Sequence, residues 1–489
     1  MKLRAHAFAG LGVLAAVALR RNVPHLQPGA LNWAENGNVA AALLQGRGFS
    51  DPFSGGTGAT AWVPPLPVWI DAVVFSVAGI KTAAAARILL ALAVAGLAGA
   101  HALLLSAGSL SGGTLRQNAG FRWAASIGFL ALLLIPPGGP FEVQSEAWLD
   151  ILLSALLLWA AVEHVRSPRP AATLGLAAVS VLGPLAHAGL ALATACVLVA
   201  LAWRDLRAFR RPSVPLIAAA AAVLAMGLWT VRNAEALGRL VPLKSNGWFE
   251  FHLANVASPN GLLRAETALR RLPFFNTLEF ERYSTLGEAR YVESFRAPSL
   301  AAVAAHPAHF AGNVGRRLVN ALAFCQREDG SEITRAHFNP ADLGRLVASG
   351  ELLPLGGTDA ACWLRIDDSP AAARGRLASL GLSAFPAVWR NWLDRREAYD
   401  AEYRSPRALA CGFLIAGAPL LALLGAALGA RGSPPAPAAW AALIAGAMVL
   451  PFVLVNHGVR HQMPLIAMQA VFFGACAQVW ASRIRGVNP

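Results

Sequence analysis

Residues 83–106 read AAAARILLALAVAGLAGAHALLLS, a run whose polar side chains are Arg87, His101 and Ser106. A helix of this length rises about 1.5 Å per residue and covers the roughly 30 Å hydrocarbon core of a bilayer. Comparable apolar runs recur along the chain, separated by short loops that carry arginine. The stretch therefore predicts one of many membrane-spanning helices.

The composition of the whole chain agrees with a membrane protein. Of 489 residues, 56% are hydrophobic and only 14% are charged, a balance that is unusual for a soluble domain of this size. The formal net charge is +14, but much of the surplus lies in short loops, where basic residues mark the cytoplasmic side. We therefore expect a polytopic membrane protein and do not expect nucleic acid as a partner.

Apolar length and loop charge together predict ten spans. They lie near residues 5–19, 83–106, 122–136, 147–165, 171–183, 186–203, 213–231, 406–428, 436–455 and 462–481. The first resembles a signal peptide, but no clear small-x-small cleavage site follows it, so we interpret it as an uncleaved span. Ten spans place both termini on the same side, which the charge bias makes cytoplasmic.

The sequence LPVWIDAVVFSVAG at residues 66–79 is apolar but short, and Asp71 interrupts it. If it crossed the membrane, eight loop arginines would lie outside, against the usual bias. They are Arg116, Arg122, Arg166, Arg169, Arg204, Arg207, Arg210 and Arg211. We therefore expect a juxtamembrane helix that lies in the membrane interface.

Two hydrophilic regions, residues 20–82 and 232–404, face outward in this topology. The second, at about 170 residues, is too long for an ordinary loop and predicts a partly folded outer segment. The chain divides into a transmembrane module at 1–231, the outer segment at 232–404 and C-terminal helices at 405–489. Cys325 and Cys362 share the outer segment, so a disulfide between them is left open. The five cysteines form no CxxC pair, so the sequence does not indicate a zinc site.

Acids and cations gather on the predicted outer side. The acids are Glu35, Glu142 and Glu146, and the basic residues are Arg232, Lys244, Arg460 and His461. A carboxylate that faces a cation-lined pocket suits a reaction in which an acceptor loses a proton while a lipid phosphate leaves. Ordinary interpretations stay open, since acids complement the dipole of a helix start and arginines anchor helices in the interface. Tryptophans near the outer boundaries, Trp62 among them, indicate an aromatic belt.

Five stretches, in order, resemble elements of one family. They are WAENGNVAAALLQGRGF with GGTGATAWVPPLPVWI, then SEAWLDILLSALLLWAA, LWTVRNAEALGRLVPLKSNGWFEFHLAN, HPAHFAGNVGRRL and VRHQMPLIAMQAV. Together they resemble bacterial integral-membrane glycosyltransferases of the GT-C fold, the group that includes protein O-mannosyltransferases and the lipid A aminoarabinose transferase. The resemblance implies an all-α bundle of about ten transmembrane helices, with juxtamembrane helices in the first outer loop and a mixed outer, periplasmic segment.

The resemblance also implies a reaction. A sugar would move from a polyprenyl-phosphate donor to a glycan, lipid or protein acceptor at the outer face of the bacterial cytoplasmic membrane. Glu35 would act as the base, and Glu146 would assist by orienting the acceptor or the base. The donor phosphate would meet Arg232, Lys244, Arg460 and His461. No cofactor is expected beyond the lipid-linked donor, and a divalent metal is left open.

The chain departs from the family pattern in the first outer loop. Relatives often carry aspartate at the position of Asn32, one helical turn before Glu35, so Glu35 is expected to take over that function. Asn32, Asn233 and Asn246 are expected to bind the acceptor or shape the loops. Two alternatives remain: a transporter or flippase of lipid-linked sugars, and a non-catalytic family member. A transporter would show symmetric halves and charges buried within spans, whereas these charges cluster outside the spans.

Overall fold

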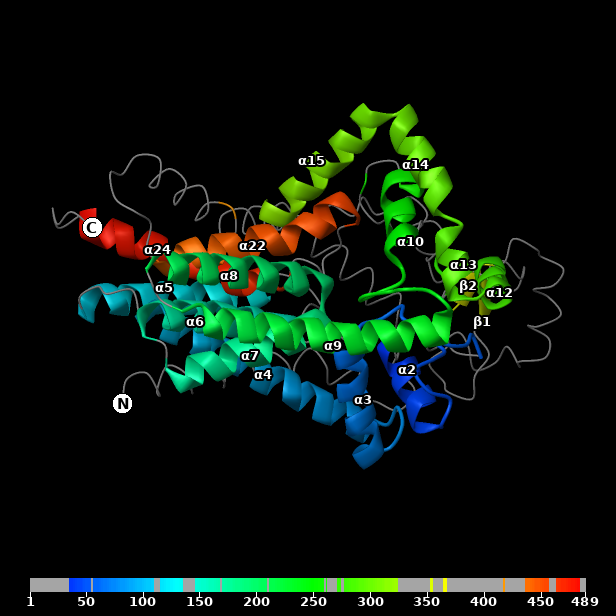
Figure 1. Cartoon of the computed structure of the whole chain (residues 1–489), viewed down its shortest axis with the longest axis horizontal. Coiled ribbons are helices and arrows are strands. Elements are labelled where there is room, and N and C mark those ends of the chain that lie inside the picture. The colour runs from blue at the N-terminus through cyan, green and yellow to red at the C-terminus, as the bar shows by residue number, and fades with distance from the viewer. Residues whose placement is uncertain are drawn as a thin grey trace, which may run out of the picture.

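The computed structural model describes residues 35–53, 56–109, 115–134, 146–167, 169–208, 211–258, 261, 271–273, 277–323, 352–354, 364–366, 417, 436–456 and 463–483. In this part of the chain, long helices form a bundle, and shorter helices gather at one end of it (Figure 1). Several predictions lie outside the described residues. They concern the spans at 5–19 and 406–428, the site residues Asn32, Arg460 and His461, and the cysteines Cys325 and Cys362.

Every predicted span in the described part has a helix at its position. These helices are α4 (Ala83–Ser109), α5 (Leu115–Leu134), α6 (Ala147–Arg166), α7 (Pro170–Ala186), α8 (Ala188–Arg207), α9 (Ser213–Leu237), α22 (Ala436–Leu454) and α24 (Leu465–Arg483). Five of them, α4, α6, α8, α9 and α22, are long and apolar enough to cross a membrane. The prediction of a helical membrane protein is therefore supported, while the ten-helix GT-C arrangement stays a prediction.

Small residues let these helices approach one another closely. The fully buried ring of Phe121 on α5 lies between α4 and α24. A Cβ atom added at Gly108 would come within 1.8 Å of that ring, and one added at Gly474 within 2.9 Å. Close backbone approach of this kind replaces the hydrophobic driving force that is missing between helices in lipid.

The antiparallel helices place unlike residues at the two ends of the bundle. The first residues of α6 and α8 and the last residue of α7 line one cleft, so this end is called the cleft end. The opposite end, where α6 and α8 finish and α7 begins, carries Arg166, Arg169, Arg204 and Arg207; it is called the arginine end. The loop arginines that the sequence predicts to share one side therefore lie at one end of the bundle.

Two shorter helices precede the bundle. Helix α2 (Glu35–Leu44) and helix α3 (Pro65–Ala78) pack on each other. Helix α3 coincides with the short apolar stretch and has 14 residues, about 21 Å of rise, which is too little to cross a bilayer. Its exposed face carries Trp69, Val73 and Val77 at a spacing of four. That apolar stripe suits a juxtamembrane helix that lies against lipid.

The outer segment folds into short helices after α9. They are α10 (Gly247–His252), the π-helix η3 (Leu253–Ala257), α12 (Thr277–Leu286), α13 (Glu288–Glu293), α14 (Arg296–Ala305) and α15 (Pro307–Ala323). Strands β1 (Leu352–Pro354) and β2 (Leu364–Ile366) pair antiparallel, with Leu352 opposite Ile366. Figure 1 shows α14 and α15 as an arch above the bundle, with α12 and α13 grouped beside α10.

A second core joins this segment to the first outer loop. Trp62 is 2% exposed and packs against the rings of Phe53, Phe249 and Tyr283 at centroid distances of 5.0, 5.1 and 5.9 Å. Such aromatic pairs add to the stabilisation that burial alone provides. The aromatic-belt interpretation of Trp62 is therefore wrong, because its ring is buried and packs against Phe249 and Tyr283 of the outer segment.

Candidate functional site

A small cleft opens where the ends of α6, α7, α8 and α22 meet. Its charged and polar lining consists of Glu146, Asp150, His187 and Lys244, and Phe452 and Pro64 add apolar walls. Three alanines, Ala147, Ala186 and Ala188, keep the helix ends narrow enough to leave this space. Two of the predicted site residues, Glu146 and Lys244, thus face the same cleft.

Asp150 and His187 are neighbours on the cleft lining. His187 is the single residue between α7 and α8, and its extended backbone turns the chain directly from one helix into the next. Its Nε2 lies 3.9 Å from Asp150 Oδ2. Asp150 is 2% exposed, and among the described residues its Oδ1 has no hydrogen-bond partner. A buried acceptor left unpaired is costly, so this oxygen is suited to a donor supplied by a ligand.

The first outer loop reaches the cleft through helix α2. Asn36 Nδ2 donates a hydrogen bond to Glu146 Oε2 at 3.3 Å, and Asn36 Oδ1 has no hydrogen-bond partner within the described ranges. Glu35, the preceding residue, is the first residue of α2 and is half-buried. The bond between Asn36 and Glu146 therefore brings the start of α2 to the cleft. The catalytic function of Glu35 stays a prediction.

Asp71 on α3 is electrostatically coupled to the cleft. Burial, together with the nearby negative charge of Glu146, raises the pKa of the Asp71 carboxyl to about 7. A carboxyl with a pKa near neutral can accept and donate protons under physiological conditions. In the sequence, Asp71 is recognisable only as an interruption of an apolar stretch, because its proximity to Glu146 depends on how α3 packs.

The raised pKa predicts a pH dependence of stability. The folded state binds more protons than the unfolded state between about pH 4 and 7, so the free energy of unfolding falls as the pH rises through this range. We expect Asp71→Asn to be about 2 kcal/mol more stable than wild type at pH 8. This is about half of the free energy that corresponds to the whole pKa shift, because solvent screens a partly exposed side chain. The two proteins should converge near pH 4. Thermal unfolding in detergent at several pH values measures this; parallel curves would contradict it.

Arg232 holds the first outer loop to α9. Its guanidinium donates to the carbonyl oxygens of Thr60 at 2.6 Å and Phe49 at 2.7 Å, and also to Asn233 Oδ1 at 3.0 Å. The group lies 5.1 Å from the ring centroid of Phe49 and 5.2 Å from that of Trp229. These contacts give Arg232 a function in loop placement, and the structure does not place it on the cleft lining. Its predicted contact with phosphate stays untested.

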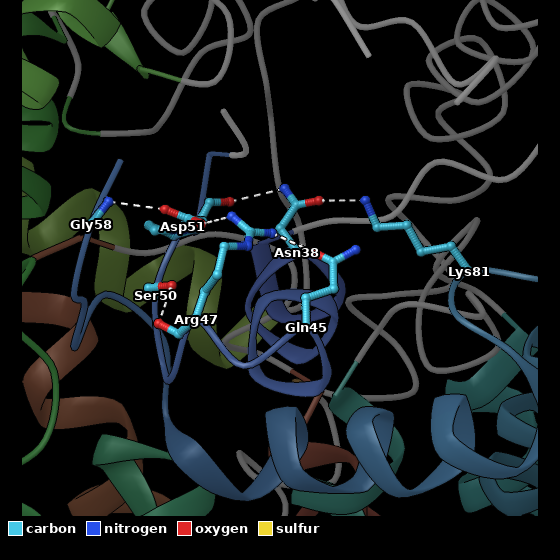
Figure 2. A network of polar contacts seen from close by, with 8 residues as sticks. Asn38, Gln45, Arg47, Ser50, Asp51, Gly58 and Lys81 are labelled. Atoms are coloured by element: carbon cyan, nitrogen blue, oxygen red, sulfur yellow. Dashed lines mark hydrogen bonds and ion pairs between the residues drawn. The ribbon is translucent and has the colours of Figure 1, made fainter. Parts of the chain in front are cut away.

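The loop that Arg232 holds also has an internal network, shown in Figure 2. Asp51 has a left-handed backbone, with φ of 62°, and its carboxylate accepts from Arg47 and, at 2.9 Å, from the Gly58 amide. Asn38 of α2 donates to the Pro52 carbonyl at 3.0 Å and accepts from Lys81 Nζ at 2.8 Å. An uncommon backbone conformation persists only where neighbours enforce it, so the network defines the shape of this loop.

Glu288 ties the outer segment to the same loop. Its carboxylate is 2% exposed and accepts from the Thr60 hydroxyl, from the Ala61 amide at 2.6 Å and from the Tyr283 hydroxyl at 2.6 Å. Burial raises the pKa of Glu288, while these hydrogen bonds oppose the shift. The sequence pattern did not single out this residue, because its loop partners lie more than 200 positions away.

Removing the Tyr283 hydroxyl tests how much its hydrogen bond to Glu288 stabilises the protein. We expect Tyr283→Phe to lower the free energy of unfolding by about 1–2 kcal/mol, because a buried carboxylate loses a donor while the ring packing is kept. Thermal unfolding in detergent measures the loss, and Thr285→Ala at an exposed position of the same helix is the control. Equal losses in both variants would show that the hydroxyl bond contributes nothing.

The two described asparagines among the predicted site residues shape loops. Asn233 is fully buried, and its Nδ2 donates to the Val241 carbonyl at 2.8 Å. Asn246 Nδ2 donates to Glu250 Oε1 at 3.2 Å, and Glu250 Oε2 accepts from Asn456 Nδ2 at 2.5 Å. Asn456 shortly precedes the segment with Arg460 and His461. These bonds agree with the loop-shaping alternative, and acceptor binding stays untested.

Within the described ranges, no group of three or more His, Cys, Asp and Glu side chains is arranged to hold a metal ion. Comparison with protein families, curated proteins and solved structures found no match to this chain. The function is therefore inferred from the cleft and from the resemblance found in the sequence.

Proposed function

We propose that this protein is a membrane glycosyltransferase that moves a sugar from a polyprenyl-phosphate donor to an acceptor at the outer face of the cytoplasmic membrane. The observation that supports the proposal most is the composition of the cleft: Glu146, Asp150 and Lys244 meet at the end of an apolar bundle. Carboxylates next to a fixed cation at a membrane boundary can deprotonate an acceptor and stabilise a departing phosphate.

Glu35, Glu146 and Lys244 each have a function in this proposed reaction. Glu35 takes the proton of the acceptor hydroxyl or amine as the acceptor oxygen or nitrogen attacks the anomeric carbon. The bond from that carbon to the phosphate oxygen breaks, and polyprenyl phosphate leaves with the electron pair. Glu146 orients the acceptor, and Lys244 stabilises the charge on the leaving phosphate. Attack opposite the leaving group inverts the configuration at the anomeric carbon.

A vesicle experiment separates transfer from transport. Sealed vesicles that contain the purified full chain and labelled lipid-linked sugars from the native membrane are incubated with a membrane acceptor extract. Label that moves onto the acceptor supports the proposal. Label that reaches the opposite leaflet and stays lipid-linked would identify a flippase, and no change with either readout would favour a non-catalytic protein. Vesicles that lack the protein give the background.

A further inference from the structure

The arginine end of the bundle, opposite the cleft, combines exposed arginines with an exposed apolar helix face. It takes no part in the proposed transfer reaction. Three helix ends meet there: Arg204 Nη2 of α8 donates to the Val165 carbonyl of α6 at 3.0 Å, and Arg169 Nη1 at the start of α7 lies 3.5 Å from Glu163 Oε1. These contacts join the three helix ends that carry Arg166, Arg169, Arg204 and Arg207.

The acids in this region are buried and lie next to basic side chains. Glu163 and Asp205 are 5% and 4% exposed. His164 Nε2 lies 3.0 Å from Asp205 Oδ2, and Arg204 Nη1 lies 3.7 Å from Asp205 Oδ1. Arg166 and Arg207 are exposed, and neither has an acidic partner among the described residues. The surface of the arginine end therefore carries positive charge that no described carboxylate nearby neutralises.

An apolar stripe on α8 leads to this charge. Val199, Trp203 and Arg207 follow one another at a spacing of four, so they share one face of the helix. Val199 and Trp203 are 69% and 58% exposed, and the Arg207 guanidinium lies 4.8 Å from the Trp203 ring centroid. In a bilayer, such a stripe lies along acyl chains, and its tryptophan sits at the level of the head groups.

Arginine at the end of a helix also complements the helix dipole. That explanation accounts for Arg204, whose guanidinium binds the Val165 carbonyl near the end of α6. Arg207 lies in the same last turn of α8, but its described contact is with a tryptophan on the exposed face of the helix. A guanidinium pairs well with phosphate oxygens, and the neighbouring stripe accommodates a hydrocarbon chain.

We propose that Arg166, Arg207 and Trp203 form a binding site for an anionic phospholipid. The head-group phosphate pairs with the arginines, and one acyl chain lies along Trp203 and Val199. Because the cytoplasmic leaflet carries anionic lipids, occupancy of this site would also orient the protein with its cleft outward. The proposal rests on the arginine end alone and does not depend on the transfer reaction.

Native mass spectrometry of the full-length protein tests the site. The protein is released from nanodiscs that contain phosphatidylglycerol and phosphatidylcholine with the same acyl chains, and the bound lipids are counted. We expect wild type to retain phosphatidylglycerol selectively. Arg166→Gln with Arg207→Gln should weaken this retention about 25-fold, because each arginine near a charged membrane surface contributes about five-fold. Arg207→Lys, which keeps the charge, should retain most of the binding.

Arg290→Gln is the matched control, since Arg290 is an exposed arginine of the outer segment. It should leave lipid retention unchanged, and thermal unfolding in phosphatidylcholine confirms that each variant is folded. Equal retention of both lipids by wild type would overturn the proposal, as would unchanged retention in the double variant. Displacement of phosphatidylglycerol by inorganic phosphate at the same concentration would overturn it too, by showing a site for free phosphate.

Discussion

Glu35→Gln is expected to reduce sugar transfer by about 10²–10⁴-fold, the usual contribution of a general base. Glutamine keeps the shape of the side chain at the start of α2 but cannot accept the acceptor proton. The protein should still fold, because the hydrogen bond from Asn36 to Glu146 joins this helix to the cleft and is kept in the variant. Glu35→Asp, which keeps the carboxylate, should recover part of the rate.

Cell-surface glycans provide the measurement, because they report transfer whichever sugar the enzyme uses. A deletion strain is complemented with wild type, with Glu35→Gln, or with Glu281→Gln as a control at an exposed acid on α12. Glycans should match those of the deletion strain only for Glu35→Gln. Wild-type glycans in that strain would show that Glu35 is not the base, and Asp71→Asn and Asp150→Asn would then identify the carboxylate that is.

Arg317→Leu is expected to lower the free energy of unfolding by about 3 kcal/mol. Arg317 on α15 is fully buried, and its guanidinium donates to the carbonyls of Val453 at 2.6 Å and Gly261 at 3.0 Å and to Asn255 Oδ1 at 2.9 Å. Each acceptor left unpaired costs about 1–3 kcal/mol. Release of the buried charge offsets part of this loss.

The contacts of Arg317 lie at the cleft end of the bundle. Val453 lies in the last turn of α22, whose orphan carbonyls need donors, and Phe452 beside it forms a wall of the cleft. Burial lowers the pKa of Arg317 to about 10, so the guanidinium is charged at physiological pH and the loss should not vary between about pH 6 and 8.

Thermal unfolding in detergent measures the effect of Arg317→Leu. Arg316→Leu makes the same change at the exposed neighbouring position and is the control. Hydrogen exchange of residues 453–456 should rise in the Arg317 variant, because the end of α22 loses its donors. A stability loss equal to that of the control would refute the prediction.

The spanning helices could be predicted because each is encoded locally. The predicted span at 147–165 corresponds to α6 (Ala147–Arg166), and the one at 213–231 lies within α9 (Ser213–Leu237). Apolar length is the signal for such helices, since in lipid every backbone polar group must be satisfied within the segment. The short apolar stretch at 66–79 also forms a helix, α3 (Pro65–Ala78), and the prediction from loop arginines that it does not cross the membrane stays a prediction.

The candidate site was only partly predictable. Glu146 and Lys244 flank predicted spans, and both line the cleft. Asp150 and His187 lie at helix ends that resemble many others, so their pairing could not be read from spacing. The bond of Glu288 with Thr60 joins residues 228 positions apart, and no local pattern carries that information.

The sequence by itself determined that this is a helical membrane protein and approximately where its long described helices lie. These properties follow from the length of apolar runs and from the cost of charges in lipid. Only the tertiary structure decided which carboxylates share a cleft, that Arg232 holds a loop and that Arg317 caps α22. Those functions depend on burial and on distances between remote segments, because a side chain acquires its chemistry from the neighbours that packing brings to it.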